Sequence, residues 1–147
     1  MENKIFDILL VEDNPDDIEI TKRAFKSARI VNRLYIVRDG KEALDFLYHQ
    51  GDYAEAEKAP RPGLILLDIN MPKLNGIEVL KYIKGDNALR QIPVIMLTVS
   101  KSEEDTVKSY DLGCNSFIQK PVRFEKFLDL IKTIGMYWGV INIHPEK

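Results

Sequence analysis

Five side chains that could do chemistry come directly after short apolar segments of the chain. They are Glu12, Asp13, Asp68, Thr98 and Lys120. If the apolar segments are parallel strands, their carboxyl ends meet at one edge of a sheet, and these side chains lie close together. Three carboxylates at one edge repel one another by about 4 kcal/mol for each pair about 4 Å apart in a medium of effective dielectric about 20. Something positive must therefore sit among them.

A hard divalent cation with oxygen ligands suits such a group of carboxylates. Mg²⁺ in particular accepts a few carboxylates together with waters and a substrate phosphate, and we expect Asp13 and Asp68 to bind it directly. Once the ion neutralises the repulsion, a carboxylate can attack phosphorus and become an acyl phosphate. Lys120 and Thr98 would then hold the phosphoryl oxygens.

The apolar segments themselves predict the sheet that positions these residues. Residues 8–11, 64–67 and 94–97 are almost uniformly apolar and rich in branched side chains, which is typical of strands buried on both faces. Residues 34–37 and 116–119 are weaker candidates for two further strands.

Helical patterns separate the predicted strands. Asn14 and Pro15 suit the start of the first helix, and Ser102 followed by Asp105 resembles a capping box at the start of the fourth. The predicted helices are a first to about Ala28, a second after Gly40, a third from Gly76 to Gly85, a fourth closing near Leu112 and Gly113, and a fifth from about Phe124 to Tyr137. Strands alternating with helices predict a doubly wound α/β fold with five parallel strands and five helices.

Composition restricts the remaining possibilities. The chain of 147 residues has the length of one domain, and its net charge of -2 gives no general attraction to nucleic acid. No apolar stretch reaches the length of a bilayer-spanning helix, and the first residues do not have the pattern of a signal peptide, so we expect a cytoplasmic protein without membrane insertion.

We expect His49 and His144 to be exposed, the stretch from His49 to Pro62 to be a solvent loop, and Cys114 to be a free structural thiol.

The ordered set Val-Glu-Asp-Asn, Leu-Leu-Asp-Ile-Asn-Met-Pro, Leu-Thr and Gln-Lys-Pro resembles a response-regulator receiver domain of the CheY-like type. The resemblance runs from about Phe6 to Thr133. It implies a flavodoxin-like sheet in the order 2-1-3-4-5 and a single receiver domain over residues 1–147, with an aromatic extension from about Met136. It further implies two-component signalling in which a histidine kinase donates the phosphoryl group and a downstream protein partner receives the signal.

The resemblance also assigns roles to individual residues. Asp68 would be the phosphoacceptor, with Glu12 and Asp13 organising Mg²⁺ and the backbone carbonyl of Asn70 completing the metal site. The resemblance also implies that Lys120, which precedes a cis Pro121, pairs with the phosphoryl group. It further implies a switch in which Thr98 moves and the Phe117 ring turns inward. Such a protein is no enzyme but a switch with self-catalysed phosphotransfer and slow autodephosphorylation.

One residue departs from the family pattern. Val99 stands where the family usually has a small residue, often Ala, and its branched side chain is expected to slow attack by water and by small phosphodonors. The long loop and the tail around Trp138 look like those of single-domain regulators that include partners of phytochrome-type kinases. The tail either supports a homodimer or kinase docking, or covers the core of its own domain.

Two rival functions differ in their requirements. An aspartyl phosphatase of the haloacid-dehalogenase type wants a second Asp two residues after the nucleophile, and this chain has Asn70 there. A receiver-like module that binds partners without phosphate is the alternative, although the retained acidic residues, Thr98 and Lys120 argue against it. The run from Glu103 to Asp105 is expected to favour a helix start and not to form a site.

Overall fold

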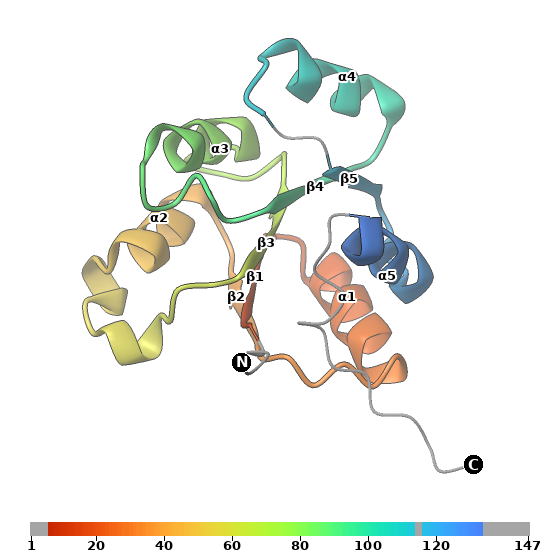
Figure 1. The fold of residues 1–147 in the computed structure, drawn as a ribbon, viewed down its shortest axis with the longest axis horizontal. Helices are drawn as coiled ribbons and strands as arrows, with labels where there is room; N and C mark the ends of the chain where they lie inside the picture. Colours follow the sequence, from red (N-terminus) through yellow and green to blue (C-terminus); the bar gives the residue numbers. More distant parts are fainter. Residues whose placement is uncertain (1–5, 114–115, 134–147) are drawn as a thin grey trace.

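The computed structural model describes residues 6–113 and 116–133 of the chain, and strands and helices alternate through them (Figure 1). The strands are β1 (Ile8–Val11), β2 (Leu34–Val37), β3 (Leu64–Asp68), β4 (Val94–Thr98) and β5 (Ser116–Gln119). The helices are α1 (Pro15–Ser27), α2 (Gly40–Tyr48), α3 (Gly76–Gly85), α4 (Lys101–Ser109) and α5 (Phe124–Thr133), with short 3₁₀ turns η1 (Gly51–Tyr53) and η2 (Ala56–Lys58).

The strands form one parallel sheet in the order β2-β1-β3-β4-β5. Helices α1 and α5 lie on one side of this sheet and α2 and α3 on the other (Figure 1). The predicted doubly wound α/β fold and its strand order are therefore confirmed. The same order places the carboxyl ends of β1 and β3 next to each other, with β4 and β5 following.

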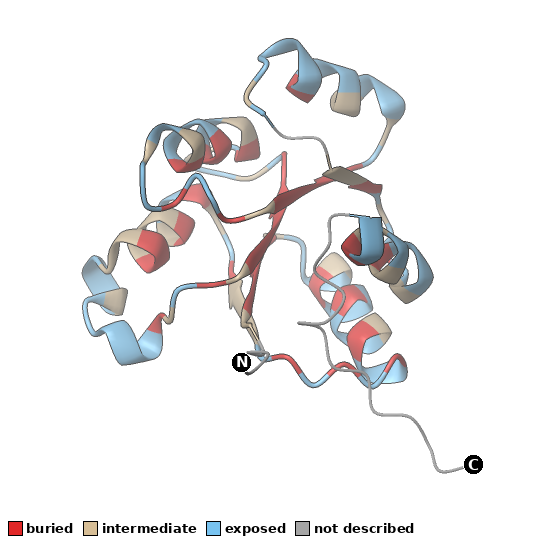
Figure 2. Cartoon of the chain, viewed as in Figure 1, coloured by how far each residue is buried: buried red, intermediate tan, exposed pale blue. Residues whose placement is uncertain are grey.

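Alternation along the strands divides the core into two layers. Leu9 and Val11 pack with α2, α3 and Val107 of α4 on one face, while Ile8 and Leu10 pack with α1 and α5 on the other. Buried residues accordingly run along the central strands and the inner sides of the helices (Figure 2). Burial on both faces explains why these strands are apolar without alternation in the sequence.

The start of α4 differs from the prediction. The helix begins at Lys101, and its N-cap is Ser100, whose side-chain oxygen accepts a hydrogen bond from the Glu103 backbone N–H at 3.2 Å. The capping box predicted at Ser102 is therefore wrong. The helix also ends sooner than predicted, at Ser109, although Gly113 does take the expected left-handed conformation with φ of 80°.

Most residues between His49 and Pro62 are exposed, as predicted for a solvent loop, but the stretch also contains the turns η1 and η2. His49 is half-buried rather than exposed, and its Nε2 lies 2.8 Å from the carbonyl oxygen of Ala59. The Tyr53 ring packs edge-on against Phe46, with the ring centroids 5.1 Å apart. The loop is thus attached to α2 by packing and by hydrogen bonds.

Some predictions concern residues that the structure does not describe. Cys114, His144, the tail around Trp138 and the expected extension of the last helix to Tyr137 all lie outside the described residues. Within the described part of the chain, no helix combines the length and apolar character of a bilayer-spanning segment.

Candidate functional site

Lys120 lies at the centre of a group of carboxylates at the carboxyl edge of the sheet. Its Nζ is 2.9 Å from Oδ1 of Asp68, 3.0 Å from Oδ2 of Asp17, and 3.1 Å and 3.3 Å from the two carboxylate oxygens of Glu12. The Lys120 side chain is only 11% exposed. A solvent-facing lysine before a turn proline is therefore excluded, and the predicted cis bond between Lys120 and Pro121 is present.

Three of the carboxylates are arranged as a metal site. Ligand oxygens of Glu12, Asp13 and Asp68 lie within 4.8 Å of one another. Glu12 and Asp68 are buried, and Asp13 is half-buried. These oxygen ligands fit a hard divalent cation such as Mg²⁺. Asn70 borders the same hollow, which has a volume of about 460 Å³.

Burial and the charge of Lys120 shift the pKa values of the acidic groups at this site in opposite directions. Burial raises the pKa of Glu12 to about 7, the charge of Asp68 acts in the same direction, and Lys120 opposes both. Burial also raises the pKa of Asp68, against the lowering effect of its contact with Lys120. For Lys120, burial lowers the pKa, but its bonds to Asp68 and Asp17 outweigh burial and hold the pKa above its usual value. The ammonium therefore stays charged among the acids.

Backbone contacts hold the strand ends that carry these residues. The Lys120 N–H donates to the Thr98 carbonyl oxygen at 2.7 Å, which ties the end of β5 to the end of β4. At the start of α3, a Cβ added to Gly76 would lie 2.1 Å from the carbonyl oxygen of Asp68. Glycine is thus needed where α3 passes the backbone at the end of β3.

The two predicted switch residues do not border the hollow. Thr98 is 1% exposed at the end of β4. Phe117 is half-buried against the core layer that contains α4, and the Lys108 ammonium lies 5.4 Å from the centroid of its ring. Val99 does border the hollow and is 56% exposed. The structure therefore brings Glu12, Asp13, Asp68, Asn70 and Lys120 together around one hollow, and Thr98 and Phe117 are not among the residues that line it.

Sequence reasoning missed two acids that contact this site. Asp17, in the first turn of α1, bonds to Lys120. Glu103, expected only to favour a helix start, accepts hydrogen bonds from Asn70 Nδ2 at 2.6 Å and from the Val99 backbone N–H at 2.9 Å. A helical signal for Asp17 was present, because Asp17 lies one turn before the buried Thr21, whereas Asp16 falls on the exposed side.

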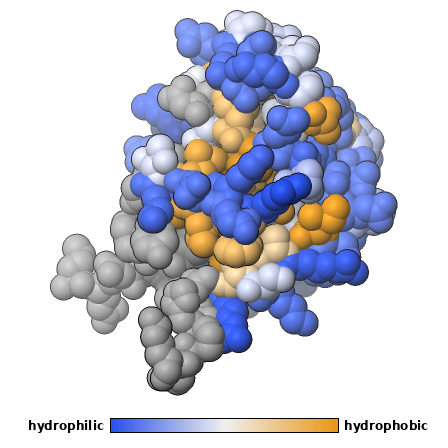
Figure 3. All heavy atoms as spheres, turned by 90° about the vertical axis from the view of Figure 1, so that its right-hand side faces the viewer, coloured by the Kyte–Doolittle hydropathy of each residue, from blue (hydrophilic) through white to orange (hydrophobic). Residues whose placement is uncertain are grey.

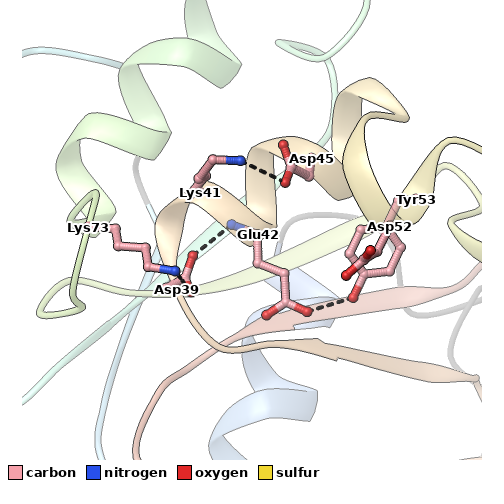
Figure 4. Close-up of a pocket in the computed structure, with 7 residues that line it drawn as sticks. All are labelled: Asp39, Lys41, Glu42, Asp45, Asp52, Tyr53 and Lys73. Atoms are coloured by element: carbon pink, nitrogen blue, oxygen red, sulfur yellow. Dashed lines mark hydrogen bonds and ion pairs between the residues drawn. The ribbon is translucent and has the colours of Figure 1, made fainter.

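A second acidic hollow of about 330 Å³ lies beside α2 and η1 (Figure 4). Three of its four carboxylates, those of Asp39, Glu42 and Asp45, have partners. Glu42 accepts from the Tyr53 hydroxyl at 2.6 Å, Asp45 pairs with Lys41 at 3.1 Å, and Asp39 caps α2 by accepting from the Glu42 backbone N–H at 2.7 Å. These contacts account for the cluster as local structure around the long loop.

Comparison with protein-family models matches residues 8–132 to the response regulator receiver domain. The chain belongs to this family. A receiver domain is a phosphoacceptor switch of two-component signalling that interacts with a histidine kinase and with downstream partners. The family resemblance drawn from the strand-end motifs is confirmed.

The chain is similar to a response regulator over most of its length. Response regulator Rcp1 of Synechocystis sp. is 41% identical over 131 residues, which are 89% of this chain and 87% of Rcp1. A Mn(2+)-bound structure of Rcp1 has a TM-score of 0.71 and 39% identity, over 96% of this chain and 99% of that one.

Two further solved structures share the fold at high identity. The bacteriophytochrome response regulator RtBRR has a TM-score of 0.86 and 45% identity, over 96% of this chain and 84% of RtBRR. The phosphorylated cyanobacterial phytochrome response regulator RcpA has a TM-score of 0.72 and 41% identity, over 91% of this chain and 94% of RcpA.

Proposed function

We propose that this receiver domain accepts a phosphoryl group on Asp68 from a phosphohistidine of its kinase. The observation that carries the proposal is the placement of Asp68 at the end of β3, with Lys120 Nζ at 2.9 Å and two more carboxylates of the metal group beside it. A carboxylate oxygen of Asp68 forms the new bond to phosphorus while the bond from phosphorus to the imidazole nitrogen breaks. The nitrogen keeps the electron pair and takes up a proton.

The groups around Asp68 stabilise the transferred charge. Lys120 donates to the phosphoryl oxygens, and Thr98 contributes its hydroxyl when the end of β4 moves. Glu12, Asp13 and Asp68, with the carbonyl of Asn70, would hold Mg²⁺, which supplies positive charge against the carboxylates and the phosphoryl oxygens. The close carboxylate oxygens and the Mn(2+)-bound form of Rcp1 support a divalent cation here.

The signal leaves through protein contacts of the single domain over residues 1–147. Phe117 of β5 adjoins a surface hollow of about 290 Å³ between β5 and α5, lined by Phe117, Ile118, Gln119, Lys126, Asp129, Leu130 and Thr133. On the side that carries α1 and α5, hydrophobic residues form an interrupted band among hydrophilic ones (Figure 3). Reorientation of Phe117 would change the shape of this surface and hence the affinity for a partner protein.

The relatives favour a particular kind of kinase. RtBRR and RcpA, which are named as phytochrome response regulators, support a phytochrome-type histidine kinase as the phosphodonor of this chain. The transfer would take place in the cytoplasm. The aromatic extension from about Met136 would serve the docking of this kinase or a homodimer. Slow autodephosphorylation would end the signal.

The test is phosphoryl uptake measured by intact mass. The full chain is incubated with Mg²⁺ and either acetyl phosphate or a phosphorylated phytochrome-type kinase, beside Asp68→Ala and a sample with chelator. We expect a gain of about 80 Da, the mass of HPO₃, in the wild type alone. If no kinase or small donor gives an adduct while partner binding persists, the phosphate-independent binding module is the correct function.

A further inference from the structure

The contacts of Lys120 are saturated by three acids from three different elements. A lysine ammonium has three N–H donors and no acceptor. Asp68, Asp17 and Glu12 lie at 2.9 Å, 3.0 Å and 3.1 Å from Nζ, so each can take one donor. Asp17 comes from α1, whereas Glu12 follows β1 and Asp68 ends β3.

Asp17 differs from the other two partners in its relation to the metal group. Glu12 and Asp68 belong to the set of carboxylates that can hold a cation, and Asp17 does not. A divalent ion bound by Glu12 and Asp68 would draw their oxygens away from Lys120 and repel the ammonium. Asp17 is then the carboxylate partner that Lys120 keeps without competition from the ion.

The position of Asp17 is fixed by the start of α1. Asn14 caps the helix by accepting from the backbone N–H groups of Asp16 and Asp17, at 2.8 Å and 3.1 Å. Both acids lie in the first turn, where a negative charge favours the helix. Only Asp17 faces the sheet edge, with a side chain 27% exposed, while Asp16 is exposed.

We propose that Asp17 is a positioning residue that keeps the Lys120 ammonium in the site once Mg²⁺ is bound and while the phosphoryl group arrives. Asp17 does not touch phosphorus and acts through Lys120. This inference rests on the proposed phosphoacceptor role of Asp68. It assigns a task to an acid outside the metal group and outside the five strand-end residues.

Two simpler roles for Asp17 predict different results. If Asp17 acted only as a negative charge near an anionic donor, its removal would speed phosphoryl uptake. If it only stabilised the first turn of α1, its removal would lower the melting temperature about as much as removal of Asp16 does, and would leave the rate unchanged. A positioning role predicts a slower reaction that Asp16 does not share.

The kinetic test compares Asp17→Asn, Asp17→Glu and the matched control Asp16→Asn, with Lys120→Ala alone and combined with Asp17→Asn. We expect Asp17→Asn to slow uptake from acetyl phosphate about tenfold at saturating Mg²⁺, the factor expected for one hydrogen bond to a charged group. Asp17→Glu should recover most of the rate, and Asp16→Asn should stay within about twofold of wild type. In the Lys120→Ala background, Asp17→Asn should add no further loss.

A second readout does not require phosphorylation. In the Mg²⁺-saturated protein without phosphodonor, a Lys120 ammonium that is hydrogen-bonded to Asp17 gives a ¹⁵N NMR signal protected from solvent exchange. We expect this signal in wild type and Asp16→Asn and its loss in Asp17→Asn. A signal retained in Asp17→Asn, uptake as fast as wild type, or an undiminished effect without Lys120 would each overturn the proposal. If the wild type itself accepts no phosphate from any donor, the phosphoacceptor function is refuted and the kinetic comparison does not apply. Loss of the NMR signal in Asp17→Asn then supports, and its retention overturns, the positioning of Lys120.

Discussion

Glu12 connects the protonation of the site to its affinity for metal. Its carboxyl is buried, and the resulting pKa of about 7 is well above the usual 4.5. A carboxyl with a raised pKa binds its proton more tightly in the folded than in the unfolded chain. Its contribution to stability is therefore fully present below about pH 4.5 and is lost as the pH rises to about 7.

The same shift predicts pH-dependent metal binding. A divalent cation requires the ionised carboxylate, so Mg²⁺ must displace the proton of Glu12 below pH 7. We expect the affinity for Mg²⁺, measured by titration calorimetry, to rise by up to about tenfold per pH unit between roughly pH 5 and 7 and then to level off. Glu12→Gln should bind more weakly and flatten the profile, whereas the exposed Glu19→Gln should not. An equally steep profile in Glu12→Gln would assign the proton to another group.

Val99 allows a prediction about the lifetime of the phosphorylated form. Its side chain borders the hollow that contains Asp68, in a position where the family usually has a smaller residue. We expect Val99→Ala to speed both uptake from acetyl phosphate and hydrolysis, each by a few-fold, because water and small donors reach the acceptor more easily. Decay followed on Phos-tag gels measures the change, with Val31→Ala, at another exposed valine, as control. An unchanged half-life would contradict a shielding role.

The residues at the site were predictable to different degrees. Asp68 ends a strand whose apolar sequence is distinct, and Lys120 follows the weaker strand candidate 116–119, so the edge on which they meet follows from the topology once both strands are accepted. Asp17 was not predicted as a partner of Lys120. Its helical position distinguishes it from Asp16, but both acids satisfy the helix dipole and nothing in the sequence pairs either of them with Lys120. Glu103 was missed for the same reason.

At the scale of the elements, Ser100 and Ser102 allow a direct comparison of two caps. Each serine has an acidic residue three positions later, so the sequence pattern fits both. The structure uses Ser100, because β4 ends at Thr98 and α4 follows at once. We expect Ser100→Ala to lower the free energy of unfolding by about 1 kcal/mol and Ser102→Ala to change it by less than about half of that. Urea unfolding measures both, and equal losses would contradict the assigned cap.

The elements themselves follow from the sequence more closely than their ends do. The buried strands, the capped start of α1 and the range of α3 were predicted where they occur, because burial on two faces, a strong capping residue and helical spacing leave distinct patterns. The stretch after α2 could not be predicted. Its packing depends on the contact of Tyr53 with Phe46 and Glu42, which lie on α2 and not in the loop.

At the scale of the whole molecule, the carboxylates that would bind a metal ion repel one another and lower the stability of the metal-free protein. Asp13 adds a negative charge to Glu12 and Asp68, whereas the ion pairs of Lys120 in the described chain are with Glu12, Asp17 and Asp68. We expect Asp13→Asn to stabilise the metal-free protein by on the order of 1 kcal/mol, or about 3 °C in melting temperature, and to abolish the rise in melting temperature that Mg²⁺ gives the wild type. Thermal melts with and without Mg²⁺ test both parts. A lower melting temperature without metal would show that Asp13 stabilises the fold.

The exposure of Val99 bears on how long a signal lasts. The lifetime of the phosphorylated form sets how long the signal persists after the stimulus has ended. Core residues such as Leu66 and Ile95 are fully buried and constrained by packing, but Val99 is largely free of such constraint. We therefore expect substitution at this one surface position to change the duration of the phosphorylated state without changing the fold.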